Sequence, residues 1–203
     1  MKVEDDIARP LSRYAPYRRA GDIVYFSGIV AADPATGRIV RGYADLPDHV
    51  RAEAGETGEM STDAKDGPIA AQSWFVLTRL RKTVEAAGGT LDDVVKLTQY
   101  FRDLRDFPTY NRIRATFFRT PPASTVVRVV ELLPTEESLL EVEAVAHIPE
   151  RPHDRVRDWI AGGIAENEAS RLFGILPEGQ SRPLVLRPDF CGAVQQGIGN
   201  RQP

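Results

Sequence analysis

The feature that most constrains the fold is a helical pattern in residues 68–87. Small and apolar side chains recur there at intervals of three and four residues, which places them on one face of a helix: Ser73, Leu77, Leu80, Val84 and Ala87. Pro68 suits the first turn of such a helix, where its missing N–H is not needed, and Gly88 suits the helix end. We expect this helix to pack its apolar face on a sheet.

Short β-rich runs and a second helix surround this segment. Runs of β-branched, aliphatic and aromatic residues between turn residues predict strands at 23–26, 94–101, 124–130 and 139–147. Residues 33–37 predict a hairpin turn, with 38–40 as the return strand. Asp106 is a candidate cap for the second helix, which Pro121 ends. This order predicts an α+β fold, a mixed sheet with two helices packed on one face.

The chain of 203 residues is long enough for one domain with an addition. We expect the domain to span residues 1–150. Within it, residues 41–67 are rich in Gly, Asp, Glu and Ala, which predicts a long surface loop. Residues 151–203 form a predicted C-terminal extension with modest apolar stripes, and we expect it to pack on the domain or on a neighbouring subunit.

Composition excludes several classes of protein. A net charge of −3 argues against binding nucleic acid through bulk positive charge. No apolar run approaches the ~18 residues of a membrane span, and the N-terminus lacks the apolar segment of a signal peptide, so we expect a cytoplasmic protein without a membrane partner. The lone Cys191 excludes an internal disulfide, and His49 has no ligand spacing with the other histidines, so no metal site is expected.

Several segments, taken in order, resemble the Rid (YjgF) family of reactive intermediate deaminases. The resemblance runs over about residues 14–148, and no single motif carries it. The segments are Ala15-Pro16-Tyr17, Val24-Tyr25-Phe26-Ser27-Gly28, Ala70-Ala71-Gln72, Val84-Glu85-Ala86-Ala87-Gly88, Asp92-Asp93-Val94-Val95-Lys96, Asp106-Phe107-Pro108-Thr109-Tyr110-Asn111, Pro122-Ala123 and Glu141-Val142-Glu143-Ala144-Val145-Ala146.

The resemblance implies a chorismate-mutase-like subunit in a homotrimer, with small-molecule clefts between subunits. It also implies hydrolysis of imines and enamines such as 2-aminoacrylate to ammonia and a 2-keto acid, without a metal or organic cofactor. Such hydrolysis needs a group that holds the substrate carboxylate, a positioned water and donors for the developing charge.

The residues that match the family's cleft are Tyr17, Ser27, Gly28, Asn111 and Glu141. The resemblance assigns Glu141 the role of holding and activating the attacking water, although an intersubunit hydrogen bond is an equally open interpretation. Where the family carries an arginine after its Pro-Ala pair, this chain has Ser124. A serine hydroxyl offers one donor and no charge, so the family's usual 2-imino-acid substrates are in question.

Two other arginines are candidate replacements. Strand alternation places Ser124, Val126 and Arg128 on one face, and Arg114 lies in the helix close to the implied cleft. Each arginine could equally be a solvated surface charge. Val126 stands where many relatives carry Cys, and Ile29 where they often carry Gln, which predicts a more apolar pocket that Tyr100 could also line.

Two hypotheses of function remain. In the first, the chain is a Rid-like hydrolase that deaminates an imine, enamine or related small metabolite in an altered pocket. In the second, it is a non-catalytic small-molecule-binding or regulatory trimer that has lost deaminase activity. Glu141, Tyr17 and Asn111 favour the enzyme, and Ser124 favours the binding protein or a changed substrate. A fold resemblance does not choose between them.

Overall fold

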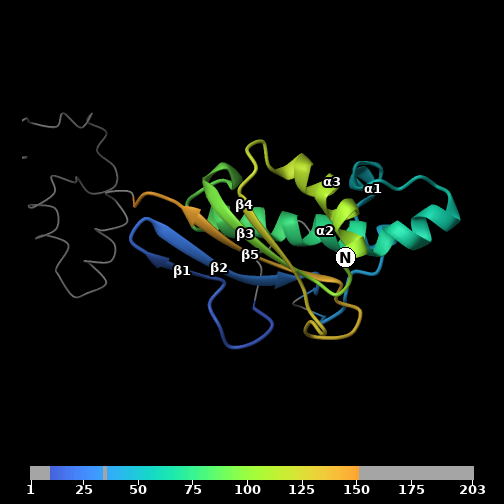
Figure 1. Ribbon diagram of the computed structural model, residues 1–203, viewed down its shortest axis with the longest axis horizontal. Coiled ribbons are helices and arrows are strands. Elements are labelled where there is room, and N and C mark those ends of the chain that lie inside the picture. The colour runs from blue at the N-terminus through green and yellow to red at the C-terminus, as the bar shows by residue number, and fades with distance from the viewer. Residues whose placement is uncertain (1–9, 34–35, 151–203) are drawn as a thin grey trace, which may run out of the picture. The chain divides into compact units, whose positions relative to one another are not determined.

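Five strands form one sheet in the computed structural model, which describes residues 10–33 and 36–150 (Figure 1). Their order is β1-β2-β5-β3-β4. The strands are β1 (Tyr17–Ala20), β2 (Ile23–Val30), β3 (Val94–Phe101), β4 (Ala123–Arg128) and β5 (Leu140–His147). All neighbouring pairs are antiparallel except β3 and β4, which are parallel and therefore need a crossover connection.

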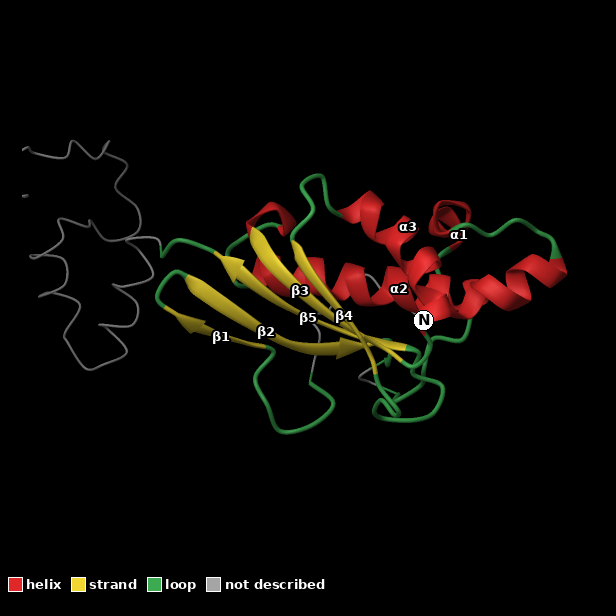
Figure 2. Ribbon diagram, in the orientation of Figure 1, coloured by secondary structure: helices red, strands yellow, loops and turns green. Residues whose placement is uncertain are grey.

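Helices cover one face of this sheet. The long α2 (Met60–Ala86) lies along it, α3 (Phe107–Phe117) forms the crossover from β3 to β4, and the short α1 (Asp48–Ala54) lies beside them. Figure 2 shows these helices on the same side of the strands. The predicted α+β fold with a mixed sheet and helices on one face is confirmed.

Strict alternation along β5 separates the two faces of the sheet. Leu140, Val142 and Ala144 are buried under the helices, whereas Glu141 and Glu143 point to the opposite, helix-free face. The apolar face of α2 packs against these strand residues and completes the core, with Leu77 and Leu80 fully buried. Burying a side chain of this size stabilises the fold by about 2 kcal/mol. The helix-free face therefore carries the polar groups of the sheet.

The segment 41–67 is not the long surface loop that its composition predicts. It contains a 3-10 turn at Tyr43–Asp45, the helix α1 and the first turns of α2. Four of its apolar residues, spaced three and four residues apart, are buried in the core: Tyr43, Leu46, Val50 and Ala54. The spacing of these residues, rather than the polar average of the segment, determines the structure.

Helix α2 also begins earlier than predicted, at Met60, so Pro68 lies inside the helix and not in its first turn. The Asp63 carboxylate accepts hydrogen bonds from the backbone N–H groups of Thr57 (2.9 Å) and Gly58 (2.8 Å), which fixes the turn before the helix. The first turns are exposed, with Met60 at 85% exposure, so they have no apolar periodicity to detect.

Two local predictions need correction. Residues 38–40 do not form the predicted return strand and make only a single bridge, between Ile39 and Ala32. The strand that pairs with β2 as a hairpin is β1, which precedes it and is joined to it by the turn at Gly21. Asp106 occupies the N-cap position of α3, but its side chain makes no capping hydrogen bond.

The predicted extension 151–203, with Cys191, lies outside the described residues. No helix in the described part of the chain is both long and apolar enough to span a bilayer.

Candidate active site

A β-bulge in β2 organises the first half of the candidate site. Phe26 pairs with Ala144 and Ile29 pairs with Val142, so Ser27 and Gly28 together oppose one residue of β5. The Ser27 hydroxyl donates to the carbonyl oxygen of Ala15 (2.7 Å), and the Ser27 N–H donates to that of Pro16 (3.1 Å). The bulge therefore holds the N-terminal segment beside β2 and breaks the regular pairing at Gly28.

Gly28 and Glu141 fit against each other so closely that no other residue is possible at position 28 without movement. A Cβ atom on Gly28 would stand 1.7 Å from Oε1 of Glu141. The Glu141 carboxyl is half-buried, and burial raises its pKa, with a smaller contribution in the same direction from the negative charge of Glu143. This arrangement places a titratable carboxyl beside a backbone segment that a small ligand can approach.

Tyr17 lies on the other side of the sheet from Glu141. Its ring packs on that of buried Phe26, with 5.9 Å between centroids, and its hydroxyl donates to the carbonyl oxygen of Ala86 (3.3 Å) at the end of α2. Within one chain, Tyr17 therefore contacts the helix layer and not the Glu141 carboxyl.

A second cluster joins α3 to β4. The Arg114 guanidinium donates to Oδ1 of Asn111 (2.8 Å) and to the hydroxyl of Ser124 (3.2 Å). The Ser124 hydroxyl in turn donates to Oε1 of the fully buried Gln99 (2.9 Å). The structure thus brings three of the predicted site residues together, and it places a guanidinium next to the position where the family arginine is missing.

The other two β4 candidates share this face but not the cluster. Val126 is half-buried and packs against the core. The Nε group of Arg128 donates to the carbonyl oxygen of Arg102 (3.3 Å), and Arg128 borders an open hollow with Asp103 and Asp106. Arg128 and Ser124 therefore lie near opposite ends of β4.

The two halves of the site lie on opposite faces of the sheet. Ser124 is paired with Leu97 and bonds Gln99, whose side chains face the helices, whereas Glu141 is paired with Tyr100 on the helix-free face. A single chain therefore does not bring the Glu141 carboxyl and the Arg114 guanidinium to one ligand.

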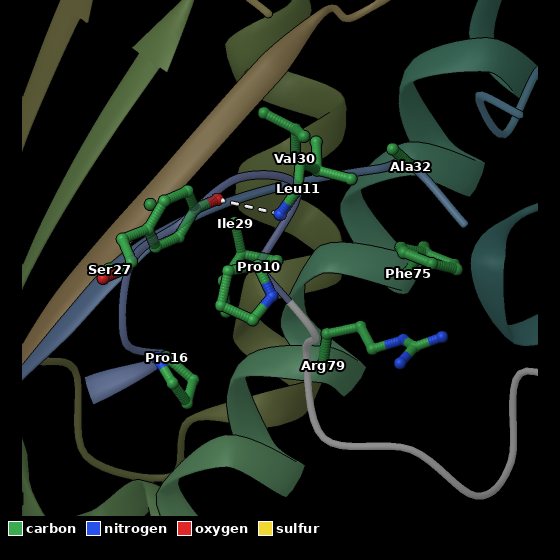
Figure 3. A pocket seen from close by; sticks show the side chains of 11 residues that line it. Pro10, Leu11, Pro16, Ser27, Ile29, Val30, Ala32, Phe75 and Arg79 are labelled. Atoms are coloured by element: carbon green, nitrogen blue, oxygen red, sulfur yellow. Dashed lines mark hydrogen bonds between the residues drawn. The ribbon is translucent and has the colours of Figure 1, made fainter. Parts of the chain in front are cut away.

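A small, open hollow adjoins the bulge (Figure 3). Ser27 and Gly28 contribute to its wall, and most of the remaining lining is apolar: Pro10, Leu11, Pro16, Ile29, Val30, Ala32 and Phe75. The charged group in the lining is Arg79 of α2, whose guanidinium lies 5.1 Å from the centroid of the Phe75 ring. Ile29, where polar glutamine is common in the family, makes part of this apolar wall.

Sequence reasoning did not identify Gln99 as a neighbour of Ser124, because the parallel register of β3 and β4 is not readable from either strand alone. Alternation along β5 places Glu143 on the same face as Glu141, where Oε1 of Glu143 accepts a hydrogen bond from the Tyr100 hydroxyl (3.2 Å). Among the described residues, no cluster of three or more His, Cys, Asp or Glu side chains is arranged to hold a metal ion.

Comparisons with known proteins agree with this architecture. The family model described as Endoribonuclease L-PSP matches residues 48–148. A RutC family protein of Pyrococcus horikoshii is 31% identical over 144 residues, covering 70% of this chain and 93% of the relative. The 3-aminoacrylate deaminase RutC of Acinetobacter baylyi is 31% identical over 140 residues, covering 68% of this chain and 90% of the relative.

A third relative, the 2-iminobutanoate/2-iminopropanoate deaminase of Dermatophagoides farinae, is 30% identical over 141 residues, covering 69% of this chain and 89% of the relative. Among solved structures, a candidate endoribonuclease from Klebsiella pneumoniae is 55% identical with a TM-score of 0.66, covering 67% of this chain and 100% of that chain. The chain therefore belongs to the Rid (YjgF) family, together with the RutC proteins.

Proposed function

We propose that this protein is a cofactor-independent hydrolase that deaminates a small imine or enamine. The overall reaction adds water to a C=N bond and releases a carbonyl compound and ammonia. Family membership supports the reaction class, since two relatives are named as deaminases of 3-aminoacrylate and of 2-imino acids. The observation that carries the proposal is the half-buried Glu141 carboxyl lodged against the bulge at Gly28.

Glu141 has the properties that the proton transfers need. As a carboxylate it takes a proton from water while the water oxygen bonds to the carbon of the protonated imine and the C=N electron pair moves to nitrogen, which gives an amino alcohol. It returns that proton to the nitrogen, and it then takes the hydroxyl proton as the C=O bond forms and the C–N bond breaks to release ammonia. Burial raises the pKa of Glu141 from 4.5 toward the pH at which the enzyme would work, which makes it a better base.

The substrate carboxylate needs a cation, and Arg114 is the best-placed one. Asn111 and Ser124 fix its guanidinium with two hydrogen bonds, so the loss of the family arginine at position 124 comes with a substitute from α3. Guanidinium groups bind carboxylates through two parallel N–H···O bonds, which also orient the substrate. In this proposal Ser124 positions Arg114 and is not a nucleophile.

The positions of the two halves support a homotrimer with clefts between subunits. Glu141 and Gly28 lie on the helix-free face, and the Arg114 cluster lies on the helix side of the same sheet. One copy of the chain would contribute Glu141, and a neighbouring copy would contribute Arg114, Asn111 and Ser124.

Ammonia release tests the proposal directly. We would measure it with freshly generated 2-aminoacrylate, 3-aminoacrylate and longer imino acids, for the wild type, for Glu141→Gln and for Glu85→Gln as an exposed control carboxylate. The wild type and the control should accelerate hydrolysis, and Glu141→Gln should lose about 10²–10⁴-fold, the usual contribution of a general acid–base group. Full activity in Glu141→Gln would refute the role of this residue.

The second candidate function is a small-molecule-binding or regulatory trimer without deaminase chemistry, and Ser124 is the observation that favours it. Ser124→Arg separates the two. If the wild type is inactive on every substrate while Ser124→Arg releases ammonia, the water site is intact and the chain has been diverted to another ligand. If the wild type is active and Arg114→Ala loses activity while Arg128→Ala does not, the enzyme is supported and Arg114 is its carboxylate-binding group.

A further inference from the structure

Three acidic groups follow one another on the helix-free face beside the bulge. Tyr100 is directly opposite Glu141 in the antiparallel pairing of β3 and β5. Its hydroxyl reaches diagonally across the ladder and donates to Oε1 of Glu143 at 3.2 Å. Tyr100 therefore pairs with Glu141, the proposed acid–base group, but its hydroxyl is hydrogen-bonded to Glu143.

Few titratable side chains of the same chain share this face with Glu141. On its own strand they are Glu143 and, at the far end, His147, and on β2 the residues beside Glu141 are Gly28 and Val30. On the adjoining strands they are Tyr25, Lys96 and Tyr100. In the proposed cleft, the Arg114 guanidinium of a neighbouring copy would also face Glu141. The ammonium group of Lys96 donates to the hydroxyl of Thr125, on the side away from β5.

This arrangement holds the two glutamates in different ways. The hydrogen bond from the Tyr100 hydroxyl fixes where the Glu143 carboxyl lies, two residues along β5 from Glu141. In the described part of the chain no side chain donates a hydrogen bond to Glu141, whose carboxyl is instead pressed against Gly28 and half-buried.

We propose that Tyr100 is a positioning residue of the reaction, whose hydroxyl holds the Glu143 carboxyl close to Glu141, where it contributes to the pH at which Glu141 exchanges its proton. The inference rests on the proposed function, because it assigns Glu141 as the acid–base group. Tyr100 itself does not touch the substrate in this proposal.

The test compares pH profiles of kcat/KM for ammonia release in the wild type, Tyr100→Phe and Glu143→Gln. Removing the donor frees the Glu143 carboxyl to move away from Glu141, and removing the carboxylate takes its negative charge away from Glu141 altogether. Both changes therefore lower the pH at which Glu141 ionises, and the acid limb of the profile should move down by about 0.5–1 pH unit. Tyr25→Phe, on the same face and 54% exposed, is the matched control and should leave the limb in place.

A second readout does not depend on turnover. In protein labelled with ¹³C at glutamate carboxyls, the Glu141 resonance is identified by its loss in Glu141→Gln and then titrated in each variant. A midpoint that moves down in Tyr100→Phe and in Glu143→Gln supports the inference. A midpoint or an acid limb that stays within about 0.2 pH unit of the wild type in either variant overturns it. Failure of the proposed function would appear separately, as a wild type that releases no ammonia.

Discussion

Gly28→Ala is the substitution for which the structure makes the sharpest prediction. The new Cβ would stand 1.7 Å from Oε1 of Glu141, 2.7 Å from its Cδ and 3.1 Å from its Cγ. Ordinary contact begins at about 3.4 Å, so the carboxyl oxygen must retreat by roughly 1.7 Å, the difference between the two distances. The clashing atoms are the far end of a flexible side chain, which can rotate away from β2.

The consequences for activity and stability therefore differ. A displacement of about 1 Å in a catalytic group can cost on the order of 10²-fold in rate, so we expect Gly28→Ala to lose at least that much ammonia release. The free energy of unfolding should fall by only about 1 kcal/mol, the lower end of the cost of overpacking, because the Glu141 side chain yields before the backbone does.

The assays are initial rates of ammonia release and unfolding in denaturant. Gly42→Ala is the control, since a Cβ there meets nothing within 4 Å. In the Glu141→Ala background the clash is absent, so Gly28→Ala should cost measurably less stability there than in the wild type. The reasoning is refuted if Gly28→Ala keeps nearly full activity, or if its stability cost is the same in both backgrounds.

Two further predictions concern the core. Gln72→Leu should destabilise the protein by about 3–5 kcal/mol in denaturant unfolding, because the buried amide bonds the carbonyl oxygens of Val40 (3.0 Å) and Glu137 (2.7 Å) and accepts from the N–H of Leu139 (2.9 Å). An effect below about 1 kcal/mol would contradict this. Tyr110→Phe should stay within about 1 kcal/mol of the wild type, since the buried hydroxyl has no hydrogen-bond partner among the described residues; a larger loss would reveal a missed partner.

The parts of the fold that the sequence predicts are those where burial follows a simple period. Helix α2 ends at Ala86, just before Gly88 as expected, and β5 alternates between buried and half-buried residues up to its exposed last residue. Segment 41–67 differs from its prediction because the exposed first turns of α2 have no apolar periodicity, and the four buried residues before them are too few to outweigh the polar composition.

The candidate site divides in the same way. The sequence identifies Glu141, Gly28 and Ser124 individually, but their relation depends on the register of the sheet. The contact between Arg114 and Ser124 joins a helix to a strand, and the clash between Gly28 and Glu141 depends on a bulge. Neither contact follows from spacing, because one residue of register shift moves a side chain to the other face.

The most direct test of the proposed cleft is complementation between two inactive variants. Glu141→Gln and Arg114→Ala are expressed together with different affinity tags, and mixed oligomers carrying both tags are purified. If each cleft of a trimer takes Glu141 from one copy and Arg114 from the next, every mixed trimer has one cleft of three with both residues intact, so the purified mixed trimers should recover about a third of the wild-type rate. Mixed oligomers no more active than the two single variants would contradict a cleft shared between copies.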